Sequence, residues 1–177
     1  MAFIIFPVFV FLMVIIIIIS YNRLTGTRKK LDKQITEILS LHKKNISLLK
    51  TACHNFSKIF PGQASLFDAV PQLILELEAK PARNLFTSAN YYNQIKAAVE
   101  EIFSATAGPI ENSGQPDYTD FVQKEREIIS GLENHIDTYN LLVTQFNKKL
   151  NQFPHNLLAG MAGLEPYAYY GSRQYEI

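Results

Sequence analysis

The side chains that could act as nucleophiles, general bases or metal ligands are scattered along this sequence of 177 residues. Cys53 and His54 are adjacent, so on a helix they would point about 100° apart, which disfavours a Cys–His catalytic dyad. The histidines match no short-range metal-binding spacing and pair with no carboxylate in a recognisable motif; they are His42, His54, His135 and His155. We therefore expect no catalytic residue, no bound metal and no cofactor.

Other signatures of enzymes and nucleic-acid-binding proteins are missing from the sequence. It has no glycine-rich phosphate loop, GxSxG or HExxH motif. The carboxylate pairs Glu100-Glu101 and Glu125/Glu127 are typical of solvated helix faces. A formal net charge of +1 argues against nucleic-acid binding, which usually requires a clear basic excess. The sequence predicts a protein that is not an enzyme, binds no nucleic acid and has no evident small-molecule substrate.

The strongest pattern in the chain is a run of apolar residues near its C-terminal end. They recur at alternating steps of four and three, the period of a helix that packs along a narrow seam: Leu132, Ile136, Tyr139, Val143, Phe146, Leu150 and Phe153. The pattern extends back to Val122, with Glu125 as its polar member. Pro154 is expected to end this helix. With no Trp, few Gly and Pro, and long periodic runs, the composition predicts an all-α chain.

The N-terminal stretch predicts a membrane anchor. Residues 3–19 carry no charge, and residues 2–21 would span about 30 Å as a helix, the thickness of a bilayer's hydrocarbon core. The alternative is a cleaved signal peptide, but the stretch lacks a basic n-region and a small-x-small cleavage site. We expect an uncleaved anchor at 1–21, a helical bundle at 22–163 and a tyrosine-rich tail at 164–177.

Basic residues directly after the apolar stretch predict the orientation in the membrane. They are Arg23, Arg28, Lys29, Lys30 and Lys33. Because basic flanks stay on the cytoplasmic side, we expect a single-pass protein of a bacterial membrane with its N-terminus outside and its body in the cytoplasm. The alternative is a periplasmic or extracellular body. The same residues would meet anionic lipid headgroups, each contributing roughly 1 kcal/mol near the surface.

The first helix is expected to continue from the anchor to Ile59. Its predicted seam combines apolar and polar residues at the same spacing: Leu24, Arg28, Leu31, Ile35, Ile38, His42, Asn45, Leu49, Ala52, Phe56 and Ile59. His42 and Asn45 would either fix the helix register or lie at the edge of the seam, and we favour the edge.

The middle of the chain predicts shorter helices. Pro61-Gly62 indicates a turn, and Ser65 followed by Asp68 offers an N-terminal cap for a helix whose apolar stripe is formed by Phe67, Val70, Ile74 and Leu77. A second helix is expected at 85–105, with one face formed by Leu85, Ala89, Tyr92, Val99 and Phe103. Residues 108–117 have the composition of a loop, after which Asp117 or Thr119 would cap the long helix.

Two polar features accompany the C-terminal helix. Asn140, Asn147 and Asn151 form a stripe beside its seam, which either bonds a neighbouring helix or subunit or lies in solvent. The tail concentrates tyrosines, whose rings are large amphipathic contact surfaces. As subunit contacts we propose Asn151, Tyr167, Tyr169, Tyr170 and Tyr175.

Several of these residues together resemble the LemA family. Tyr139-Asn140 is followed seven residues later by Phe146-Asn147, and then by Phe153-Pro154 and Asn156, Leu157, Leu158, Ala159 and Gly163. The N-terminal half agrees through its anchor and the sequence Tyr21-Asn22-Arg23-Leu24. Three departures indicate a divergent member: Lys50-Thr51 replaces Pro-Asn, Ile136 stands where arginine is common, and Phe146 replaces a tyrosine. The resemblance implies an antiparallel up-and-down bundle of long helices continuous with one N-terminal transmembrane helix. It brings no established catalytic activity or cofactor.

Two functions fit this sequence. The first is a non-enzymatic, membrane-anchored helical scaffold that self-associates, with membrane lipid and further copies of itself as partners. The second is a membrane-anchored binding module that recruits a protein partner through residues 108–117 or the tyrosine tail.

Overall fold

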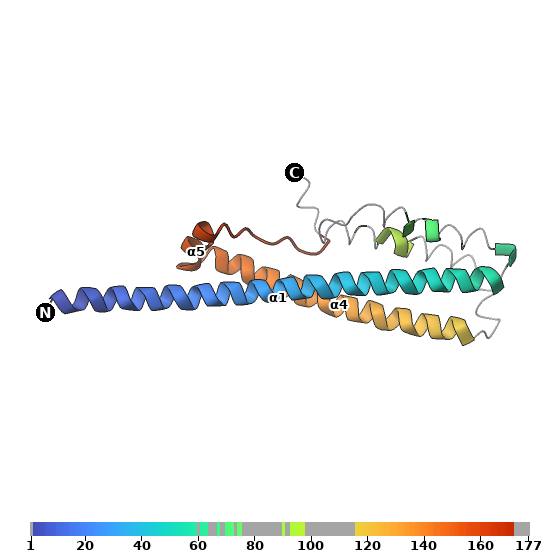
Figure 1. The fold of residues 1–177 in the computed structure, drawn as a ribbon, viewed down its shortest axis with the longest axis horizontal. Helices are drawn as coiled ribbons and strands as arrows, with labels where there is room; N and C mark the ends of the chain where they lie inside the picture. Colours follow the sequence, from blue (N-terminus) through green and yellow to red (C-terminus); the bar gives the residue numbers. More distant parts are fainter. Residues whose placement is uncertain are drawn as a thin grey trace.

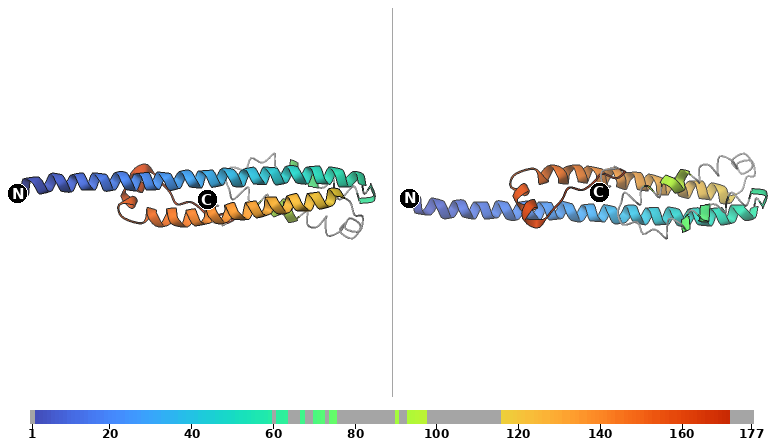
Figure 2. Two further views of the ribbon diagram at one scale, coloured as in Figure 1. Left: turned by 90° about the horizontal axis from the view of Figure 1, so that it is seen from below. Right: turned by 90° about the horizontal axis from the view of Figure 1, so that it is seen from above.

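The computed structural model describes residues 2–59, 61–63, 67, 70–72, 74–75, 90, 93–97 and 116–171. Its elements are the helix α1 (Ala2–Ile59), the 3₁₀ turn η1 (Pro61–Gln63), and the helices α4 (Pro116–Leu150) and α5 (His155–Ala162). The long helices α1 and α4 lie side by side and run in opposite directions, while the N-terminal part of α1 extends beyond the bundle (Figure 1, Figure 2). No strand occurs among the described residues, and the predicted all-α bundle is confirmed.

The first helix is uninterrupted over 58 residues and ends at Ile59, as predicted. At 1.5 Å per residue it is about 87 Å long. By length and composition it could cross a membrane. Its apolar N-terminal side chains are exposed, with Phe6 at 71% and Phe11 at 65%. From residue 6 onward, Ser20 is the first buried residue of the helix. The bundle therefore begins where the apolar stretch ends.

Among the described residues, the core consists of two clusters along α1. The distal cluster lies far from the N-terminus and contains Leu49, Ala52, Cys53, Phe56, Phe67, Val70, Ile74, Ile95 and Phe121. The proximal cluster lies nearer the apolar stretch and contains Leu24, Leu31, Ile38, Leu132, Tyr139, Val143, Phe146, Leu150 and Ala159. Most of the predicted seam residues of both long helices belong to these clusters.

Polar residues of the first helix depart from the predicted seam in two ways. His42 and Asn45, between the clusters along α1, are only 5% and 2% exposed, so their predicted place at the edge is wrong. The ring of Tyr170 lies beside His42, with centroids 6.2 Å apart. Arg28 is exposed and Thr27 is buried in its place. A straight helix drifts from a 3.5-residue repeat, and this one-residue shift keeps the guanidinium in water.

The second long helix has different ends from those predicted. It begins at Pro116, a favourable first position because proline has no N–H to satisfy there. Asp117 and Thr119 therefore lie inside its first turn and not ahead of it. Near this end, Phe121 and Ile128 are buried, whereas Val122 and Ile129 are half-buried. The Phe121 ring packs edge-on against Phe56, with centroids 6.0 Å apart.

The C-terminal end of α4 corrects the prediction for Phe153. The helix ends at Leu150, and a turn follows in which the Gln152 N–H donates to the Lys149 carbonyl at 3.0 Å. Pro154 disfavours helical geometry in the residue before it, so the chain has left the helix before the next seam position. Phe153 is 65% exposed and does not belong to the seam.

Parts of the predicted middle helices are described. Phe67, Val70 and Ile74 are buried in the distal cluster, which confirms these positions of the apolar stripe. Residues 93–97 are helical and contribute Ile95 to the same cluster. The remaining predicted positions lie outside the described residues: Ser65, Asp68, Leu77, Leu85, Ala89, Tyr92, Val99, Phe103 and the loop 108–115.

Candidate functional site: a tail segment bound along two helices

The most elaborate polar arrangement in the described structure holds residues 164–171, which we call the tail segment. Gly163 ends α5 in the left-handed conformation, with φ of 59°, and the Leu164 N–H donates to the Ala159 carbonyl at 2.9 Å. Glycine adopts this conformation without steric cost, so it can reverse the chain direction here. The tail segment then runs back along the α1–α4 pair (Figure 1, Figure 2).

Asn147 binds the tail segment at two points. Its Nδ2 donates to the Tyr167 carbonyl and its Oδ1 accepts from the Tyr167 N–H, both at 2.9 Å. One primary amide thus satisfies both backbone groups of one residue, as a neighbouring strand would. The side chain therefore fixes the position of the tail along α4 without depending on the tail residue's own side chain.

Asn140 repeats this contact one heptad earlier. Its Oδ1 accepts from the Tyr170 N–H at 2.9 Å. Seven residues of a helix rise about 10.5 Å, and three residues of extended chain span roughly 10 Å. The separation of the two asparagines therefore matches the separation of Tyr167 and Tyr170 along the tail.

The two aromatic residues that precede these asparagines also contact the tail segment. The Tyr139 hydroxyl donates to the Ala168 carbonyl at 2.8 Å. Burial, together with the nearby Tyr167, raises the pKa of Tyr139 to about 12, so the hydroxyl keeps its proton and remains a donor. The Phe146 ring meets Tyr167 edge-on, with centroids 5.2 Å apart. We call Tyr139, Asn140, Phe146 and Asn147 the tail clamp.

The tyrosine rings of the tail reach across to α1. The Tyr167 hydroxyl donates to Asp32 Oδ1 at 3.3 Å. Burial raises the pKa of Tyr167, and the Asp32 carboxylate raises it further, while Arg28 opposes the shift. The Tyr170 hydroxyl lies 3.0 Å from His42 Nε2, and burial lowers the pKa of His42 from 6.5 to about 4. The tail therefore connects the two long helices: the tail backbone binds α4, and the tail side chains bind α1.

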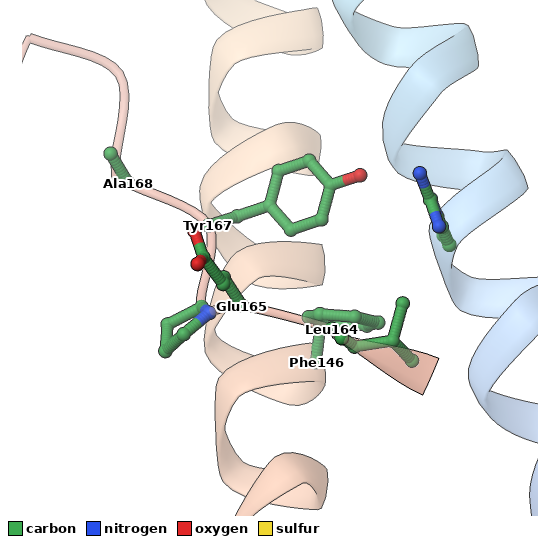
Figure 3. A pocket seen from close by; sticks show the side chains of 8 residues that line it. Phe146, Leu164, Glu165, Tyr167 and Ala168 are labelled. Atoms are coloured by element: carbon green, nitrogen blue, oxygen red, sulfur yellow. The ribbon is translucent and has the colours of Figure 1, made fainter. Parts of the chain in front are cut away.

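A pocket of about 350 Å³ opens beside this crossing. Tyr167 points its hydroxyl towards α1, and Phe146 and Leu164 lie together below it (Figure 3). Arg28 and Glu165 add opposite charges to the lining. In the described part of the chain no group of three histidines, cysteines or carboxylates is placed to hold a metal ion.

The structure unites only some of the residues singled out in the sequence. The tail clamp brings together four motif residues, whereas Phe153 and Pro154 lie in the turn beyond α4. The asparagine stripe divides: Asn140 and Asn147 bind the tail of the same chain, whereas Asn151 donates to the Asn147 carbonyl of its own helix at 3.2 Å.

The residues proposed for subunit contacts have different surroundings. Tyr167 and Tyr170 are half-buried against their own chain. Tyr169 is 41% exposed, with its hydroxyl 3.1 Å from Thr144 Oγ1, and Asn151 is exposed. Tyr175 lies outside the described residues. The basic flank is exposed along α1 in all its members: Arg23, Arg28, Lys29, Lys30 and Lys33. Their role as subunit contacts or topology signals stays a prediction.

Sequence reasoning missed the α1 partners of the tail. The sequence assigned no role to Asp32, and His42 was placed at the edge of the seam. A signal for His42 was available, because a polar residue that keeps the seam spacing among buried apolar residues usually has a hydrogen-bonding partner. No comparable signal pairs Asp32 with a residue 135 positions away.

These features define an all-α protein in which a long apolar N-terminal helix continues into an antiparallel helix pair, with a C-terminal segment strapped across both helices. The chain belongs to the LemA family, whose family model matches residues 28–176. The match begins just after the apolar stretch and includes the tail clamp and the tail segment. A comparison with curated proteins gave no significant match, and neither did one with solved structures.

Proposed function

We propose that this protein is a non-enzymatic scaffold, anchored in a bacterial membrane by α1, that self-associates at the membrane. The continuity of α1 carries the proposal, because a single helix forms both the apolar stretch and one wall of the bundle core. Such a helix transmits the position and tilt of the anchor directly to the body. Family membership is consistent with a scaffold, since the LemA family brings no established catalytic activity.

An exposed patch supports the self-association. Leu141 is 59% exposed on α4, and Thr144 lies one turn further along the same face. Tyr169 contacts Thr144 through its hydroxyl and is itself 41% exposed. A large aliphatic and an aromatic side chain thus border the same threonine on the outer surface. Aromatic residues are enriched at protein interfaces, where they combine apolar area with a polar tip.

The exposed basic flank supports an orientation with the N-terminus outside and the body in the cytoplasm. A protease site added after Ile177 should resist protease supplied to the outside of intact cells and be cut once the membrane is permeabilised. Cutting in intact cells would instead support a periplasmic or extracellular body.

The decisive experiment is the mass of the full-length protein in a mild detergent, measured by light scattering after size exclusion. A discrete complex of several chains supports the scaffold, and Leu141→Glu should reduce its mass, because the new carboxylate would be desolvated in the contact. Ser47→Glu, on the exposed surface of α1, is the matched control and should leave the mass unchanged. A monomeric wild type would refute self-association.

Point substitutions are preferable to removing the tail in this experiment. Leu164, Tyr167 and Tyr170 pack against the proximal cluster, so truncation after Gly163 would uncover the core. A change in mass after truncation would then report a damaged fold.

The alternative is an anchored module that recruits a protein partner. The tail segment favours it, because the α1–α4 surface already binds an extended backbone through side-chain amides. A monomer in detergent that captures a partner dependent on residues 108–117 or the tail would support this function.

A further inference from the structure

The turn after α4 and the helix α5 form an uncharged unit. Residues 150–164 contain no Asp, Glu, Lys or Arg. Three large apolar side chains at intervals of four residues are exposed there: Phe153 at 65%, Leu157 at 58% and Met161 at 86%. Leu157 and Met161 lie one helical turn apart on one face of α5, and we call these three residues the α5 face.

The opposite side of α5 attaches it to the bundle. Ala159 is 7% exposed and packs in the proximal cluster with Leu24 and Leu150. The α5 face is therefore turned away from the core that holds the helix. A charge-free helix with one side packed and the other exposed and apolar is typical of a surface that another apolar medium covers.

The position of α5 indicates which medium this is. Its core partner Leu24 lies four residues after Ser20, where the bundle begins, and α5 sits beside α1 at the end of the bundle that faces the N-terminus (Figure 1, Figure 2). Lys149, just before the turn, donates to Thr27 Oγ1 at 3.1 Å. The charges of Lys149 and Arg23 also lower the pKa of His155, which burial lowers in the first place, so α5 begins near Arg23.

Distances along α1 place this region at the membrane surface. Ile19 is the last residue of the apolar run, and Arg23 follows it by about 6 Å along the helix axis. The headgroup layer on each side of a bilayer is roughly 5–7 Å thick. A protein whose α1 fills the hydrocarbon core with residues 2–21 therefore holds α5 at the depth of the headgroups.

We propose that the α5 face inserts into the headgroup–acyl boundary of the same bilayer that α1 crosses. The exposed Arg23 lies near His155 at the start of α5 and supplies a charge that suits anionic lipids. The body is thereby held by two contacts, a span and an interfacial helix, which restrict its tilt and rotation. This inference rests on the membrane anchoring in the proposed function and not on self-association.

Tryptophan scanning tests the inference cleanly because the chain contains no Trp. Full-length Met161→Trp is reconstituted in vesicles of phosphatidylcholine and phosphatidylglycerol, with and without brominated acyl chains, which quench Trp within the bilayer. Phe11→Trp, in the apolar stretch, reports the anchor. Leu75→Trp is the matched control, because Leu75 is equally apolar and 60% exposed but belongs to the chain near the distal cluster.

We expect brominated lipid to reduce the emission of Met161→Trp at least half as strongly as that of Phe11→Trp, and to leave Leu75→Trp unchanged. Quenching of Phe11→Trp with none of Met161→Trp would overturn the inference while leaving the anchor intact. If the emission of Met161→Trp is blue-shifted but not quenched, the α5 face is covered by a second copy of the chain and not by lipid. That result would also overturn the inference. Leu157→Trp replaces Met161→Trp if circular dichroism shows that the latter has lost helix. Absence of quenching in Phe11→Trp would refute the anchor itself, and with it the proposed function.

Discussion

The tail clamp predicts a specific effect of Asn147→Ala. The substitution removes two hydrogen bonds to the Tyr167 backbone, and net contributions of about 1 kcal/mol each give a loss of about 2 kcal/mol. Alanine returns about 0.6 kcal/mol in helix propensity. The net destabilisation should therefore be about 1.5 kcal/mol.

Asn134→Ala is the matched control for this variant. Asn134 lies on the same helix and is exposed, so the substitution changes helix propensity in the same way without touching the tail. The difference between the two variants isolates the contacts to Tyr167, which we put at about 2 kcal/mol.

Amide hydrogen exchange of the full-length protein in detergent is the appropriate assay, because the tail can open while the helices stay folded. A difference of about 2 kcal/mol should accelerate exchange at the Tyr167 amide roughly 30-fold in Asn147→Ala relative to Asn134→Ala. The Tyr170 amide should accelerate as well if the tail opens as a unit, although its acceptor Asn140 is intact. Equal exchange at Tyr167 in both variants would refute the clamp.

Three further predictions concern the proximal half of the bundle. Burial lowers the pKa of His42 from 6.5 to about 4. As the pH falls, His42 is therefore protonated in the unfolded chain before it is protonated in the folded chain, and the free energy of unfolding should fall by up to about 3 kcal/mol between pH 6.5 and pH 4. We expect the unfolding midpoint of His42→Gln to depend less on pH across this range than that of the wild type. The control His54→Gln should keep the wild-type pH dependence, since His54 is exposed. Tyr139→Phe removes one donor to the tail and should cost about 1 kcal/mol in chemical denaturation, so an unchanged midpoint would contradict the bond. Phe146→Asp places a charge at a position with 0% exposure and should abolish cooperative unfolding, whereas Gln145→Asp on the exposed face should not.

The sequence was sufficient to predict the elements whose period is long and regular. The end of α1 at Ile59 follows from an uninterrupted pattern that meets Pro61. The buried positions of α4 from Leu132 to Leu150 follow from strict steps of three and four. Phe153 was misplaced because the apolar spacing continues for one step after the backbone has left the helix, and spacing alone does not record that departure.

The site was predictable in its members but not in its role. The repeated aromatic–asparagine pairs mark residues that do more than pack, since asparagine is a poor helix former. Their partner is the backbone of a segment 20 to 30 residues further on, and it reaches them only because Gly163 reverses the chain. Backbone groups are the same at every residue, so no sequence signal names Tyr167 or Tyr170 as the ones bound.

The division of the core explains why the tail needs such specific attachment. Two helices alone leave an apolar stripe open on each side, so a third layer must cover the core. In the distal cluster the chain segments that contain Phe67, Val70, Ile74 and Ile95 supply that layer. In the proximal cluster α5 and the tail segment supply it, through Ala159, Leu164, Tyr167 and Tyr170. An extended segment has no helical hydrogen bonds of its own, so its backbone groups must find partners on the helices it covers. The tail clamp provides these partners, and in doing so it ties α4 to the part of α1 that leads into the apolar stretch.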